Sequence, residues 1–106
     1  MELVVVKGGG KLPPFLFKMK DYKEQKINEK VFIREFNESK SGEYDWHRDH
    51  EDRTVEVLFA DVGWRFQIDN QLPVLLRTGQ IVRIKKNVFH RLIKGYGKLI
   101  VRLTKN

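Results

Sequence analysis

A succession of short extended segments, separated by turn residues, is the feature that most constrains how this chain can fold. From Trp46 onward, apolar and β-branched runs are interrupted by Asn, Gly or Pro about every 8 to 12 residues. Residues 64–68 alternate apolar and polar side chains, as a half-buried strand does, whereas residues 55–59 are apolar on both faces except at Glu56. No helix alternates with these strands. The pattern predicts an all-β fold, either a sandwich or a double-sheet barrel.

The expected elements number about nine short antiparallel strands in one domain, because 106 residues are too few for a second, cofactor-binding lobe. Residues 19–30 are polar and leave two possibilities open, a short helix or one arm of a hairpin. Residues 37–45 contain Asn, Ser and Gly and predict a loop. The strands that we expect include residues 2–7, 31–36, 55–59, 64–68, 81–84, 89–93 and 99–103.

The composition excludes several classes of protein. The chain contains no cysteine, so disulfides, thiolate metal sites and catalytic thiols are excluded, and a reducing compartment is compatible with it. No apolar run approaches the roughly 18 to 20 residues that cross a bilayer, and residues 1–7 do not resemble a secretion signal. We therefore expect a cytoplasmic protein that does not enter a membrane.

The net charge of +7 is distributed unevenly. Residues 35–61 carry three basic and nine acidic side chains, whereas residues 71–106 carry nine basic and none that is acidic. Such asymmetry can attract nucleic acid, but the explanation that we favour is that Lys and Arg lie on the solvated faces of strands and offset the acidic segment. We expect no nucleic-acid partner. The apolar strand expected at residues 2–7 would be an open sheet edge, which predicts a homodimer formed through it.

Residues 46–59 contain a concentration of ionisable side chains that leads directly into an apolar strand. Two histidines and four acidic residues lie in this segment. If this segment is extended, His47 and Asp49 point to one side, and Arg48 and His50 point to the other. One imidazole and one carboxylate at this spacing can share a divalent metal ion, and a second imidazole completes a facial two-histidine, one-carboxylate set. The remaining histidine is His90. The metal hypothesis therefore requires residues 47–50 and 90 to meet.

Two segments resemble the paired motifs of the cupin family, which are small jelly-roll barrels, or double-stranded β-helices. The first motif is similar to HRD at residues 47–49 followed by EVLFADVG at 56–63, and the second to GQIVRIKKNVFH at 79–90. Where the second motif usually has Pro and a turn Gly, this chain has Lys85 and Asn87. The resemblance covers residues 42–103, which would be the core of a single cupin-like domain spanning residues 1–106, with N-terminal strands in residues 1–36.

The resemblance implies that the two motifs face each other inside one barrel and bind a divalent metal ion, such as Fe, Mn, Ni or Zn. The implied ligands are His47, Asp49, Glu56 and His90. The gap between Asp49 and Glu56 is longer than is usual in the family, so a second register, with His50 and Asp52 as ligands, competes with the first. The aromatic Trp46 directly before His47 favours the first register.

The same histidines and carboxylate also resemble the H-x-D…H set of iron and 2-oxoglutarate oxygenases, for which Arg102 would be the residue that binds the co-substrate carboxylate. Three function classes remain open. The first is a dioxygenase-like, metal-dependent cupin that acts on a small anionic or oxygen-bearing ligand. The second is a metal-free sugar-nucleotide isomerase or epimerase. The third is a non-catalytic binding or structural cupin. The aromatic residues Trp46, Trp64, Phe66 and Phe89 are expected to form core and cavity lining.

Overall fold

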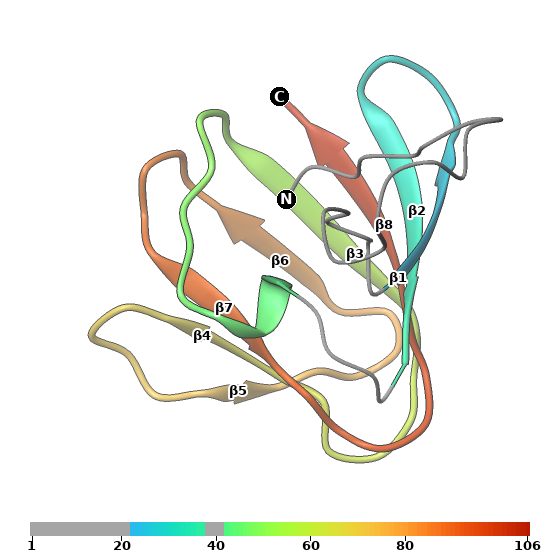
Figure 1. The fold of residues 1–106 in the computed structure, drawn as a ribbon, viewed down its shortest axis with the longest axis vertical. Helices are drawn as coiled ribbons and strands as arrows, with labels where there is room; N and C mark the ends of the chain where they lie inside the picture. The colour runs from blue at the N-terminus through green and yellow to red at the C-terminus, as the bar shows by residue number, and fades with distance from the viewer. Residues whose placement is uncertain (1–21, 38–41) are drawn as a thin grey trace, which may run out of the picture.

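Eight strands and one 3-10 helix make up the described part of the chain, residues 22–37 and 42–106, in a computed structural model (Figure 1). The elements are β1 (Tyr22–Lys26), β2 (Val31–Phe36), η2 (Gly42–Tyr44), β3 (Arg53–Ala60), β4 (Arg65–Ile68), β5 (Val74–Leu75), β6 (Ile81–Ile84), β7 (His90–Ile93) and β8 (Leu99–Lys105).

The strands form two antiparallel sheets. The larger sheet has the order β1-β2-β8-β3-β6, and the smaller sheet has the order β5-β4-β7. Figure 1 shows the larger sheet behind and to the right, and the smaller sheet at the lower left. The predicted all-β jelly-roll fold is confirmed. About nine strands were expected, whereas eight lie in the described residues, and the strand expected at 2–7 falls outside them.

Most of the predicted strands are found close to their expected positions. The strand expected at residues 31–36 coincides with β2, and the strand expected at 81–84 coincides with β6. Of residues 19–30, residues 22–26 form one arm of a hairpin and residues 27–30 its turn, since β1 pairs with β2 from Tyr22 opposite Phe36 to Lys26 opposite Phe32; residues 19–21 lie outside the described residues. The side chain of Asn28 accepts hydrogen bonds from the backbone N–H groups of residues 30 and 31 and so closes the turn.

The two sheets bury their apolar side chains against each other. Trp64, Val57 and Leu99 are the largest fully buried side chains, and the indole N–H of Trp64 donates to the backbone carbonyl of Tyr96 at 3.1 Å. Strand β3 shows why this core forms: Val57 is inside the core and the partly buried Val55 packs against it, while the intervening residue points to the other face of the sheet.

Several turn residues have left-handed backbone conformations. Asn70 and Asn87 have positive φ angles of 65° and 64°, and Gly63 and Gly79 have φ angles of 84° and 91°. Asn87 stands where the cupin motif has a turn glycine, and it adopts the left-handed conformation that Asn tolerates better than most residues. Within the described residues, no helix is long and apolar enough to cross a membrane.

Candidate metal centre

Three side chains of the predicted set come together between the sheets. One ligand atom each from His47, Asp49 and His90 lies within 4.8 Å of the other two. An isolated antiparallel bridge joins the two histidines: His47 N–H donates to His90 C=O at 3.0 Å, and His90 N–H donates to His47 C=O at 2.8 Å. The ring centroids are 4.3 Å apart. The meeting that the metal hypothesis required therefore occurs.

Because residues 46–50 are extended, their side chains point alternately toward the inside of the barrel and toward solvent. His47 and Asp49 point inward, whereas Arg48 and His50 are exposed. A hydrogen bond from the backbone N–H of Asn87 to the carbonyl of Asp49, at 2.7 Å, keeps this segment against the turn before β7. Asp52, the carboxylate of the alternative register, is exposed and accepts from the backbone N–H of Lys86 at 2.9 Å. The geometry thus favours the first register over the second.

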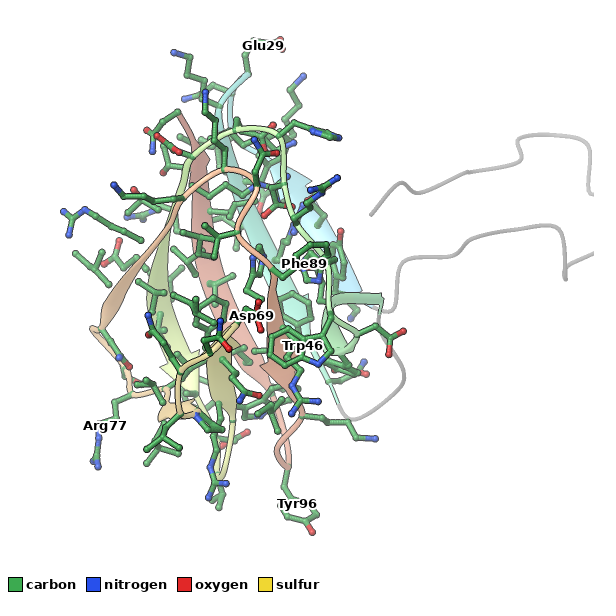
Figure 2. All side chains as sticks on the ribbon, turned by 90° about the vertical axis from the view of Figure 1, so that its left-hand side faces the viewer. Glu29, Trp46, Asp69, Arg77, Phe89 and Tyr96 are labelled. Atoms are coloured by element: carbon green, nitrogen blue, oxygen red, sulfur yellow. The ribbon has the colours of Figure 1, made fainter. Side chains whose placement is uncertain are left out.

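The outer side of the same bridge carries two pairs of an arginine and an aromatic ring. The guanidinium of Arg91 lies 4.8 Å from the ring centroid of Trp46, and that of Arg48 lies 5.3 Å from that of Phe89. Figure 2 shows Trp46 and Phe89 near each other on one face of the molecule. Both rings are 43% exposed, so their predicted placement in the core was wrong, because the inward position of each histidine turns its neighbours outward.

Both imidazoles are oriented by their Nδ1 atoms. Nδ1 of His47 lies 2.8 Å from the carbonyl of Asp45, and Nδ1 of His90 lies 2.8 Å from the carbonyl of Val88. Because a carbonyl only accepts, each Nδ1 carries the proton and donates it. A neutral ring then presents a bare Nε2 lone pair toward the inside, which is the arrangement that a metal-binding histidine needs.

Two buried atoms of this cluster lack a hydrogen bond of acceptable geometry within the described residues: His47 Nε2 and Asp49 Oδ2. Asp49 Oδ2 lies 3.2 Å from His90 Nε2, and His47 Nε2 lies 3.0 Å from Glu43 Oε1. In each contact, a carboxylate oxygen faces a nitrogen lone pair, and the two electron-rich atoms repel each other unless a proton or a cation lies between them. The donor set therefore fits a divalent metal ion.

Arg53 fixes the orientation of the Asp49 carboxylate. Its Nη1 lies 3.4 Å from Asp49 Oδ1, and its Nε donates to Glu51 at 2.6 Å, so Oδ1 is occupied while Oδ2 turns toward His90. Burial alone would raise the pKa of Asp49, but the contact with His90 and the charge of Arg53 outweigh burial and lower the pKa. Asp49 is thus a carboxylate at neutral pH.

Glu43, on the 3-10 helix η2, is a buried acid beside the cluster. Burial would raise the pKa of Glu43, but the contact with His47 and the positive charges of His47 and Arg34 outweigh it and lower the pKa to about 2. Burial correspondingly opposes the protonation of His47, yet its contact with Glu43 and the charge of Glu43 raise the pKa of that imidazole. The phenol of Tyr44 donates to the carbonyl of Asn37 at 2.7 Å, which anchors η2 next to the site.

The cluster lines a small cavity of about 60 Å³. Most of its walls are apolar, and two guanidinium groups, those of Arg34 and Arg53, border it. Arg34 is 6% exposed and donates from Nε to Glu24 at 2.6 Å. The remaining lining residues are Phe36, Val55, Phe66, Leu76, Val82, Ile84, Leu92, Leu99, Val101 and Leu103.

Glu56, the fourth ligand that the resemblance implied, does not join the other three. It follows Val55 and precedes Val57 on β3, so the alternation of the strand turns it to the opposite face of the sheet. There its Oε1 accepts from Arg102 at 2.9 Å. Arg102, the candidate for binding a co-substrate carboxylate, is consequently also directed away from the cavity.

Sequence reasoning missed Glu43 and Arg34. The inward position of Arg34 could have been predicted, because Arg34 and Phe36 are two residues apart on the 31–36 strand and therefore share a face. No sequence pattern placed Glu43 near the site, since it lies in a loop without periodicity and approaches the site only in the tertiary fold.

No protein-family model matches this sequence, and no curated protein is significantly similar to it. Solved structures, in contrast, share the fold. A cupin domain from Bordetella pertussis is 20% identical, with a TM-score of 0.55 over 80% of this chain and 91% of that chain. The DMSP lyase DddQ from Ruegeria pomeroyi is 11% identical, with a TM-score of 0.67 over 99% of this chain and 55% of that chain.

A third similar structure is that of FeII HppE, which is 15% identical, with a TM-score of 0.57 over 72% of this chain and 41% of that chain. Identities this low establish the fold and nothing finer. The two antiparallel sheets and the match to a cupin domain along almost its whole length agree with the paired motifs of the sequence. This chain has the fold of a small cupin domain.

Proposed function

We propose that this chain is a metal-dependent cupin that holds a divalent ion with His47, Asp49 and His90 and binds a small anionic or oxygen-bearing ligand in the adjoining cavity. The observation that carries the proposal is the cluster itself, in which one ligand atom each of His47, Asp49 and His90 lies within 4.8 Å of the other two. Two imidazoles and a carboxylate are the donors of the facial set that binds Fe, and they also suit Mn, Ni or Zn.

The cavity supports a small ligand. A volume of about 60 Å³ has room for a handful of water molecules or a molecule of a few heavy atoms. The guanidinium groups of Arg34 and Arg53 at its border are already paired with carboxylates, so an anionic group of the ligand would be attracted chiefly by the bound ion. The bound ion would polarise an oxygen atom of the ligand as a Lewis acid.

The solved structures of similar fold support this proposal in one respect. The similar structure of HppE is that of its Fe(II) form, so a chain of this fold holds an iron ion elsewhere.

Metal analysis tests the proposed site directly. Protein purified without a histidine tag should contain close to one equivalent of Fe, Mn, Ni or Zn, measured by plasma mass spectrometry after dialysis against metal-free buffer. His47→Ala and His90→Ala should each lose most of this metal, whereas His50→Ala, which removes an exposed histidine three residues from His47, should retain it. Metal-free wild-type protein that also rejects added ions in calorimetry would refute the proposal and favour a non-catalytic barrel.

A further inference from the structure

A second cavity, larger than the one beside the candidate metal centre, lies between strands β4, β5 and β6. Its volume is about 210 Å³, against about 60 Å³ for the cavity that the cluster lines. Strand β6 ends the larger sheet and β5 ends the smaller one, so the outer edge of each is unpaired within the described residues. Because the second cavity lies at these free edges, we call it the edge cavity.

The walls of the edge cavity suit an uncharged apolar group. Six of its lining residues are apolar and the other two are Gln71 and Gln80, so no charged side chain is among the described residues that line it. The amide oxygen of Gln80 already accepts from the backbone N–H of Arg77 at 3.0 Å. Moving a charged group from water into such surroundings is unfavourable, whereas apolar surface gains free energy by leaving water. An apolar cavity of about 150 Å³ accepts benzene, so the edge cavity has room for one ring or a short branched chain.

Several apolar side chains of the edge cavity are exposed to solvent. The exposed fractions are 85% for Leu72, 47% for Val74 and 53% for Ile81. An apolar group placed among them would remove their surface from water as well as its own, and this burial would favour its binding.

The edge cavity adjoins the cavity of the candidate metal centre. Phe66 of β4 and Val82 of β6 line both cavities and therefore lie between them. The ring centroid of Phe66 is 5.6 Å from that of His90, so this ring also lies against the proposed metal ligands. The inner cavity has room for only a few heavy atoms, and any larger ligand of the proposed site needs space beyond it. The edge cavity is the neighbouring space of the right size.

We propose that the edge cavity receives an uncharged apolar group, of about the size of a benzene ring, that belongs to the same ligand whose oxygen-bearing end reaches the ion. This inference rests on the proposed function, which assigns the ion and the oxygen-bearing end. Phe66 and Val82 lie where the two ends of such a ligand are joined, so the size of these two side chains decides which ligands fit.

A titration of the methyl-labelled chain with toluene, followed by NMR, tests the edge cavity without any metal. Saturable shifts should appear at the methyl groups of Val74, Ile81 and Val82, which line the edge cavity. The methyl groups of Leu75 are the internal control. Leu75 is the neighbour of Val74 on β5 and is 40% exposed, but it does not line the cavity, so its shifts should stay unchanged.

A second titration tests whether the apolar group and the metal-binding end belong to one ligand. Acetohydroxamate binds a metal ion through two oxygen atoms, and related hydroxamates carry a phenyl ring directly or on a short alkyl linker. In calorimetry with the Zn²⁺-loaded chain, at least one phenyl hydroxamate should bind at least about 10-fold more tightly than acetohydroxamate, because its ring leaves water.

Val74→Trp and Leu75→Trp are a matched pair of variants for the second titration. The indole of Val74→Trp should fill the edge cavity and remove the advantage of the phenyl ring. Leu75→Trp adds the same indole one residue further along β5, outside the cavity, and should keep that advantage. Circular dichroism confirms that both variants are folded.

The outcomes separate this inference from the proposed function. A wild-type chain that binds no Zn²⁺ would refute both. If Zn²⁺ binds but toluene causes no saturable shifts, or the phenyl ring brings no advantage, the inference is overturned and the proposed function stands. Light scattering that shows a wild-type dimer and a monomeric Val74→Trp would also overturn the inference, because a second copy of the chain would then cover the edge cavity.

Discussion

Asp49 is the residue on which the candidate site depends most, because its two oxygens have different partners. Oδ1 contacts Arg53 and Oδ2 faces His90, so the side chain links a fixed cation on β3 to the ligand position on β7. An amide of the same shape could keep the contact with His90 but would carry no charge for the ion. The charge, rather than the shape, is therefore the property to test.

Asp49→Asn should weaken the binding of a divalent ion by more than the roughly 10- to 100-fold that follows the loss of an outer-shell partner. The measurement is isothermal titration calorimetry with Mn²⁺ or Zn²⁺ at neutral pH. Asp52→Asn, which changes an exposed carboxylate three positions away, should bind as wild type does. Equal losses in the two variants would show that the net charge of the loop, and not a ligand, had been measured.

The sequence allowed some of these residues to be predicted and not others. His47, Asp49 and His90 were accessible because histidine is rare in this chain and because the period of an extended segment says which neighbours share a face. Glu56 was chosen from the motif spacing, although the alternation with Val55 and Val57 already argued for an outward position. Glu43 could not be predicted, because a loop residue acquires its neighbours only from the tertiary fold.

Among the elements, the turn between β7 and β8 sets a strict limit on side-chain size. A Cβ atom on the buried Gly95 would collide with the backbone of residues 62–64, next to the fully buried Trp64. The turn that precedes β4 and the turn that follows β7 thus pack backbone against backbone at this end of the barrel. Position 95 therefore requires glycine because there is no space for a Cβ atom, and not because the backbone has a positive φ angle.

Gly95→Ala should lower the free energy of unfolding by about 1 to 3 kcal/mol, as overpacking of a rigid region does. Urea denaturation followed by tryptophan fluorescence measures this, since Trp64 adjoins the site of the change. Gly79→Ala serves for comparison, because its Cβ would meet no atom within 4 Å and its cost comes only from the positive φ of 91°. A larger loss for Gly79→Ala than for Gly95→Ala would contradict the predicted collision.

Strand positions were predictable wherever one face is buried, because burial imposes a period of two on the side chains. The hairpin arm of β1 was ambiguous for the same reason: residues 23–26 are mostly exposed and polar, so no period indicated a strand. Its register comes from pairing with β2, and Tyr22 supplies the buried contact, with its ring centroid 4.9 Å from that of Phe36.

For the molecule as a whole, Tyr22 makes stability depend on pH in the alkaline range. Burial raises the pKa of Tyr22 to about 12, and the charge of Arg34 opposes this shift only in part. Because the pKa in the folded state lies above that of the unfolded chain, about 10, the stabilisation is fully present below pH 10 and is lost as the pH rises toward 12. Urea unfolding at pH 8 and pH 11 should show this loss, and Tyr22→Phe should show less of it. An identical pH dependence in the two proteins would exclude Tyr22 as its source.

Metal binding should also stabilise the whole fold, because the proposed ligands connect the loop before β3 with β7. An ion present at 100 times its dissociation constant should raise the free energy of unfolding by about 2.7 kcal/mol. Thermal denaturation with and without a chelator measures this difference. His90→Ala should lose the metal-dependent increment whatever its own stability is, and an unchanged increment would place the ion elsewhere.

Around the bridge between His47 and His90, neighbouring side chains face opposite sides. The histidines point inside, while the two pairs of an arginine and an aromatic ring lie outside. Inserting or deleting one residue next to His47 would invert this assignment, so that Trp46 or Arg48 would fill the cavity and the imidazole would lie in solvent. The number of residues in this segment is thus as strict a requirement as their chemical type. Homologues that bind metal in this way should vary in the outward side chains and keep the length unchanged.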